Sequence, residues 1–140
     1  MNVSQVDKSY YLKGLLILAG RDRCVDPRER ELMLKFAKIL DFDKRFCEAT
    51  IDDLFRNKYL TREPIVFSGI GITRCFIRDG IRLAYVDADI HPKEMAWLKT
   101  IAKANGLTEK WLSSEIKRFL QKKFQPDLPP SLEIQRYLNK

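Results

Sequence analysis

Acidic side chains recur at two matching places along the chain. Asp22 and Glu29 are seven residues apart, and so are Asp87 and Glu94, with Asp89 as an additional acid in the second place. Each pair spans the expected end of one helix and the first turn of the next, so its carboxylates could converge on a small, hard cation such as Ca²⁺, Mg²⁺ or Mn²⁺. The spacing excludes an EF-hand loop, in which the bidentate glutamate follows the first aspartate by about eleven residues.

The same acids also have a structural interpretation. Glu29 and Glu94 lie where a capping box or the helix dipole favours an acid, and Asp22 and Asp87 can accept backbone N–H groups in a turn. Acid–base catalysis has the least support, because neither a nucleophile nor a phosphate-binding loop accompanies the acids. We therefore expect a protein that is not an enzyme, with a divalent cation as its one candidate cofactor.

Cysteine and histidine usage narrows the kind of metal site further. The chain has three cysteines, Cys24, Cys47 and Cys75, with no Cys-x-x-Cys pair, and a single histidine, His91. This set disfavours a disulfide framework and a thiolate or imidazole-rich zinc site, so any metal would need oxygen ligands. We expect His91 beside a helix start, and Trp97 and Trp111 in or beside the core.

The chain is basic, with 26 Lys and Arg residues against 19 Asp and Glu residues, and a net charge of +7. The densest basic stretch contains Lys117, Arg118, Lys122 and Lys123, and apolar residues interrupt it. Such a pattern is typical of the solvated face of an amphipathic helix. The alternative is a surface that binds nucleic acid or another anionic surface through these four residues.

Helical periodicity dominates the sequence, and no segment of comparable length alternates with a period of two. Asp26 and Pro27 form a helix start, Asn105-Gly106 predicts a left-handed helix stop, and Thr108 is a plausible cap for the helix after it. The connection at 59–71 is expected to hold at most a short helix. Helices are predicted near 5–22, 27–40, 44–57, 73–87, 92–105, 109–123 and 131–138.

The chain also matches itself after a shift of 65 residues. Tyr11–Phe55 aligns without a gap on Phe76–Leu120, and expected core positions coincide, as for Leu12 with Ile77 and Ala37 with Ala102. Only eight of the 45 pairs are identical, so the coincidence of the apolar positions carries the argument. We interpret the repeat as an internal duplication of a three-helix unit.

The two helix corners resemble those of the tellurite-resistance TerB-like family. The resemblance rests on Leu18-Ala19-x-x-Asp22-x-x-Val25-x-Pro27-x-Glu29 and on Leu83-Ala84-x-x-Asp87-x-Asp89-Ile90-His91-Pro92-x-Glu94, and covers most of residues 11–120. Where the family favours glycine after the aspartate, this chain has Arg23 and Ala88. The resemblance implies an all-helical, internally duplicated bacterial protein, a stress-associated interaction or sensor role, and a metal or ligand role for the acids.

The length of the chain fits one domain of about seven helices, since 140 residues can form one sizeable core. Neither three-helix unit is expected to be large enough to fold on its own. We expect an all-α domain over 1–140, with units near 5–57 and 73–123. The tail helix at 131–138 either packs on the core or is available to a partner. The longest apolar stretch is far shorter than a membrane span, and we see no leader, so the expected location is cytoplasmic. The interaction role that the resemblance implies makes another protein the expected partner.

Overall fold

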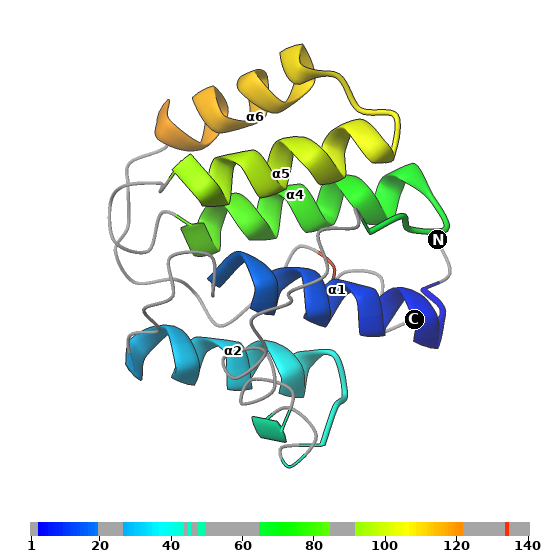
Figure 1. The fold of residues 1–140 in the computed structure, drawn as a ribbon, viewed down its shortest axis with the longest axis vertical. Helices are drawn as coiled ribbons and strands as arrows, with labels where there is room; N and C mark the ends of the chain where they lie inside the picture. The colour runs from blue at the N-terminus through cyan, green and yellow to red at the C-terminus, as the bar shows by residue number, and fades with distance from the viewer. Residues whose placement is uncertain are drawn as a thin grey trace.

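Five helices contain most of the described residues in this computed structural model (Figure 1). They are α1 (Gln5–Ala19), α2 (Pro27–Ile39), α4 (Ile70–Ala84), α5 (Pro92–Ala104) and α6 (Glu109–Gln121). No strand occurs among the described residues, which confirms the all-α class. The structure describes residues 3–19, 27–43, 45, 48–49, 65–84, 92–121 and 134, with the backbone alone at 16, 19, 27–30, 32 and 33.

Most helix starts agree with the periodicity of the sequence. The exception is α4, which begins at Ile70, about three residues earlier than predicted, because the amide and hydroxyl of Thr73 both donate to the carbonyl of Gly69. Gly71 therefore lies inside the first turn instead of in the connection. Of the helix expected at 44–57, the structure describes only residues 45, 48 and 49, which are helical.

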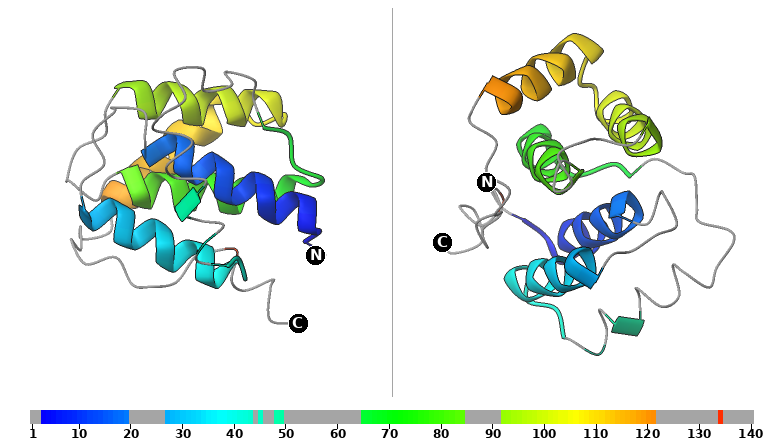
Figure 2. Two further views of the ribbon diagram at one scale, coloured as in Figure 1. Left: turned by 60° about the horizontal axis from the view of Figure 1, so that its bottom comes forward. Right: turned by 90° about the vertical axis from the view of Figure 1, so that its left-hand side faces the viewer.

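Along the long axis of the molecule the helices are stacked in the order α2, α1, α4, α5 and α6 (Figure 1). α4 contacts α1, α5 and α6, while α1 also contacts α2 and α5, so α1 and α4 form the centre of the stack. The end-on view in Figure 2 shows α5 and α6 on one side of this central pair and α2 on the other. Both faces of α4 are consequently covered, which explains why ten of its fifteen residues are buried.

An aromatic cluster fills the space between α1 and α4. The rings of Tyr11 and Phe76 meet edge to face with centroids 5.3 Å apart, and Phe67 completes the cluster at 5.9 Å and 5.4 Å from them. Edge-to-face contacts add to the hydrophobic gain from burying these rings. Tyr11 and Phe76 are both fully buried, so they anchor the two central helices to each other.

Small residues allow the helices to approach closely. A Cβ atom at Gly14 would lie 2.6 Å from the Phe76 ring, and one at Gly80 would lie 2.8 Å from Leu98. The indole N–H of Trp97 donates to the carbonyl of Gly14 at 3.2 Å, with the indole 2% exposed. Trp97 is thus a core residue, as predicted, and it ties α5 to α1.

Helix boundaries recur after a shift of 65 residues. α1 and α4 begin at Gln5 and Ile70, and α2 and α5 end at Ile39 and Ala104, so both kinds of boundary differ by 65. The predicted core positions Leu12 and Ile77 are both buried, as are Ala37 and Ala102.

The ends of α2 and α5 also correspond. Asp41 and Gly106 both have positive φ, at 66° and 83°, and the next amides, of Phe42 and Leu107, donate back to Ala37 and Ala102 at 2.8 Å. This is the Schellman arrangement, which satisfies the carbonyls at a helix end. It confirms the left-handed stop predicted at Gly106.

Two further predictions concern the residues that follow. Thr108 caps α6 as predicted, because its hydroxyl accepts the amide of Trp111 at 3.0 Å. Ile134 is fully buried in the hydrophobic core, so the tail packs back on the core at this residue. The rest of the expected tail helix at 131–138 lies outside the described residues.

Candidate functional site

The acidic corners lie where α2 and α5 begin. Both helices start at a proline, Pro27 and Pro92, whose fixed φ and missing N–H suit the first helical position. Glu29 and Glu94 are therefore each the third residue of their helix. Of the five predicted ligands, only Glu94 has a described side chain, and it is half-buried.

The remaining members of the predicted site lie outside the described residues. These are Asp22, Asp87 and Asp89; Glu29 is described through its backbone only. His91, which was predicted beside a helix start and not as a ligand, also lies outside the described residues. Within the described part of the chain, no group of three or more His, Cys, Asp or Glu side chains is arranged to hold a metal ion. A cation at the second corner would need Asp87 or Asp89 beside Glu94, since carboxylate oxygens are the donors that Ca²⁺ and Mg²⁺ prefer.

The predicted basic surface lies partly on α6. Lys117 and Arg118 are exposed on this helix, whereas Lys122 and Lys123 lie outside the described residues. The guanidinium of Arg118 lies 3.8 Å from the carboxylate of Glu115. Because Arg118 is 67% exposed, this ion pair is screened by water and leaves the cation available at the surface.

Charge is segregated between the surface and the interior in α4–α6. The described residues of 65–121 include nine Lys and Arg residues against four Asp and Glu residues. Two of those four acids are buried, Asp79 and Glu115. Seven of the nine cations are exposed, so the outer surface of these helices is positive: Arg74, Lys93, Lys99, Lys103, Lys110, Lys117 and Arg118.

Three buried carboxylates that the sequence analysis did not single out join the helices. The hydroxyl of Tyr11 donates to Asp79, which also lies 3.8 Å from the guanidinium of Arg82. Glu115 accepts from the guanidinium of Arg78 at 3.2 Å and 3.4 Å, linking α6 to α4. The sequence signal for Asp79 is an acid inside an apolar stripe, which predicts a buried partner.

The third buried carboxylate, Asp7, forms a capping box with Ser4. The hydroxyl of Ser4 accepts the amide of Asp7 at 3.1 Å, and the amide of Ser4 approaches the Asp7 carboxylate at 3.4 Å. Ser68, just before α4, donates its amide at 3.0 Å and its hydroxyl at 2.5 Å to the same carboxylate. The Ser-x-x-Asp spacing resembles the known Ser-x-x-Glu signature of a helix start, which could have revealed the local half of this cluster.

The hydrogen bonds around Asp7 also change the pKa of its carboxyl group. Burial raises the pKa of this carboxyl, but hydrogen bonds from Ser68 and Ser4 to the ionised form outweigh burial and place the pKa below its ordinary value of 3.8. Asp7 is therefore ionised near neutral pH, and its charge lies in the favourable first turn of α1.

The described side chains thus provide one predicted corner acid, Glu94, and a positive surface over α4–α6. Known protein families, curated proteins and solved structures contain no match to this chain. Among the described helices, none combines the length and the apolar character needed to cross a membrane.

Proposed function

We propose that this protein is a non-enzymatic, stress-associated interaction or sensor domain of the TerB-like kind, acting in the cytoplasm through contacts with another protein. The observation that supports the proposal is a repeat in the helix boundaries: α1 and α4 begin 65 residues apart, and α2 and α5 end 65 residues apart. Matching ends at Asp41 and Gly106 extend the correspondence beyond the helices. We infer from it an internal duplication of a three-helix unit.

The corner acids supply the sensing part of the proposal. Glu29 and Glu94 occupy the same third position in α2 and α5, and each follows an aspartate, Asp22 or Asp87, by seven residues. A divalent cation bound at a corner would fix one helix end against the next helix start. Ca²⁺, Mg²⁺ or Mn²⁺ fits the oxygen-only donor set, with Asp89 as an additional ligand at the second corner.

Thermal denaturation with each of these ions tests the cation site. An ion that binds the folded state preferentially raises the melting temperature. We expect such a rise for the wild type and a loss of the rise in Glu94→Gln and Asp87→Asn. Glu109→Gln is the matched control, because Glu109 is an exposed acid at the start of another helix, α6. If no ion shifts the wild type, the acids act as caps and turn ties, and the cation part of the proposal is wrong.

The interaction part has its own test. Chemical crosslinking in a bacterial extract, followed by mass spectrometry, should recover a protein that is crosslinked to this chain in a fixed stoichiometry. Recovery of no such protein over a range of growth conditions, including tellurite and oxidative stress, would contradict an interaction role.

A second candidate function is the binding of nucleic acid or another anionic surface. The positive outer surface of α4–α6 favours it, with Lys117 and Arg118 exposed and Lys122 and Lys123 following in the sequence. Filter binding at two salt concentrations tests this function, because contacts with phosphates release counterions and weaken as salt rises. Absence of salt-sensitive binding to both RNA and DNA would exclude nucleic acid.

A further inference from the structure

A surface groove separates the second half of α5 from the beginning of α6. Its volume is about 350 Å³, within the range of pockets that accept small ligands or a side chain of a partner. The apolar residues Ala102, Leu107 and Leu112 line it, and all three are buried beneath the surface. The groove therefore has an apolar floor, and its volume can hold an aliphatic side chain.

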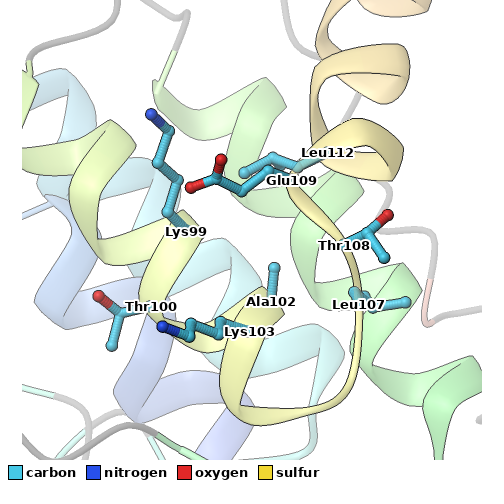
Figure 3. Close-up of a pocket in the computed structure, with 8 residues that line it drawn as sticks. All are labelled: Lys99, Thr100, Ala102, Lys103, Leu107, Thr108, Glu109 and Leu112. Carbon is cyan, nitrogen blue, oxygen red and sulfur yellow. The ribbon is translucent and has the colours of Figure 1, made fainter.

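The walls of the groove carry unlike charges. Lys99 and Lys103 lie one helical turn apart on α5, both exposed, and neither forms an ion pair with a described residue. On the opposite wall, the carboxylate of Glu109 extends from the start of α6 towards α5 (Figure 3). The α5 wall thus presents two available cations beside the apolar floor.

The cations of α4 that lie closer to the core differ from these lysines, because Arg78 is paired with Glu115 and Arg82 with Asp79. After a shift of 65 residues Lys103 aligns with Lys38, whereas Lys99 aligns with Leu34, so the pair of lysines is specific to α5. Two neighbouring lysines at the edge of an apolar groove complement a ligand that combines carboxylates with an aliphatic group.

We propose that this groove binds an acidic segment of a partner protein, with one aliphatic side chain on the floor and acidic side chains beside Lys99 and Lys103. The inference rests on the proposed interaction function and names the chemistry of the partner. An apolar floor favours a peptide over nucleic acid, since phosphates and sugars gain little from such contact. Glu109 repels carboxylates from the α6 wall, so the acidic side chains of the partner lie along α5.

Fluorescence anisotropy with short labelled peptides tests the groove directly. The probe is a peptide of glutamates interrupted by leucines, compared with a lysine–leucine peptide, an all-glutamate peptide and a single-stranded oligonucleotide. We expect the glutamate–leucine peptide to bind tightest. Lys99→Ala/Lys103→Ala should weaken its Kd roughly fivefold or more, and Glu109→Gln should tighten it about twofold.

The matched control is Lys35→Ala/Lys38→Ala, which removes two exposed lysines from α2 and the same net charge from the protein. This variant should bind the glutamate–leucine peptide with a Kd within about twofold of the wild-type value, since exposed charges more than a Debye length from the groove are screened. In methyl NMR spectra of the wild type, the Leu107 and Leu112 signals should shift when the glutamate–leucine peptide is added. All four substituted lysines are exposed, so both variants are expected to fold normally.

Three outcomes would overturn the groove proposal. The wild type binds no glutamate–leucine peptide; the α5 and α2 variants weaken binding equally; or the oligonucleotide binds tighter and leaves the Leu107 and Leu112 signals unmoved. The crosslinking experiment distinguishes this failure from failure of the interaction role. A partner that is recovered equally with wild type and with Lys99→Ala/Lys103→Ala contradicts the groove alone, whereas recovery of no partner contradicts the interaction role as well.

Discussion

The hydroxyl of Tyr11 on α1 donates a hydrogen bond to the buried carboxylate of Asp79 on α4. In the 65-residue repeat, Tyr11 corresponds to Phe76 and Asp79 corresponds to Gly14. Phe76 and Gly14 also contact each other across the same two helices. One contact is polar and the other is an aromatic ring against a glycine. Related positions thus use different chemistry to hold α1 against α4.

Removal of the Tyr11 hydroxyl tests the value of the polar contact. Tyr11→Phe keeps the ring but takes a donor from a buried carboxylate, so we expect the free energy of unfolding to fall by about 1–3 kcal/mol. In a double-mutant cycle with Asp79→Ala, the two effects should differ from additivity by about 0.5–3 kcal/mol. Urea denaturation measures both quantities, and strict additivity would show that the two side chains are not coupled.

Asp7 should make the stability of the fold depend on pH. Its folded-state pKa is lowered, so its contribution is fully present above the unfolded value of 3.8 and is lost as pH falls through the folded-state pKa. We expect Asp7→Asn to cost about 1–3 kcal/mol at neutral pH, because charge-assisted hydrogen bonds to Ser68 and Ser4 are lost.

The gap between Asp7→Asn and the wild type should then narrow below about pH 4, where the wild-type carboxyl begins to take up its proton. Urea midpoints measured over a pH series check this. Glu31→Gln, which changes an exposed acid on α2, serves as the control. A gap that stays constant down to the lowest pH at which the protein folds would contradict the role assigned to the Asp7 charge.

Local signals in the sequence predicted most of the helix boundaries. Pro27 and Pro92 indicate two helix starts, Gly106 indicates a stop, and Thr108 indicates a cap, because each acts on its own stretch of backbone. The buried polar contacts could not be predicted in this way. The partners of Asp7 and Asp79 are 61 and 68 residues away in sequence, at Ser68 and Tyr11, and only tertiary packing brings them together.

The same distinction applies to the candidate sites. The sequence places Glu29 and Glu94 correctly at the third position of their helices, since a helix start is a local feature. Whether these acids bind a cation stays a prediction. The groove beside Lys99 could not be predicted, because its floor forms only when α6 packs against α5.

Gly14 should be intolerant of even a methyl group. The Cβ of Gly14→Ala would lie 2.6 Å and 2.7 Å from two atoms of the Phe76 ring, and this ring is held by Tyr11 and Phe67. Although alanine favours a helix by about 1 kcal/mol, displacement of the ring should dominate and destabilise the protein by about 1–3 kcal/mol.

The control for this substitution is Gly69→Ala, because nothing lies within 4 Å of the Cβ that it would add. We expect the urea midpoint to be nearly unchanged, with an effect of about 0.5 kcal/mol or less. Equal stability of the Gly14 and Gly69 variants would mean that α1 and α4 can separate without loss, contrary to the close packing described above.

Substitutions at the helix ends Asp41 and Gly106 should change the stability of the protein in opposite directions. Both residues adopt positive φ, which costs about 1 kcal/mol for a residue with a Cβ and nothing for glycine. Asp41→Gly should therefore stabilise the protein by about 0.5 kcal/mol, helped by removal of a negative charge from the C-terminal end of α2 and opposed by the greater freedom of glycine in the unfolded chain. Gly106→Ala should destabilise it by about 1 kcal/mol. Thermal and urea denaturation of the two variants measure both changes. Changes of the same sign would contradict this reasoning, because the two ends share the same left-handed backbone conformation, with aspartate at one end and glycine at the other.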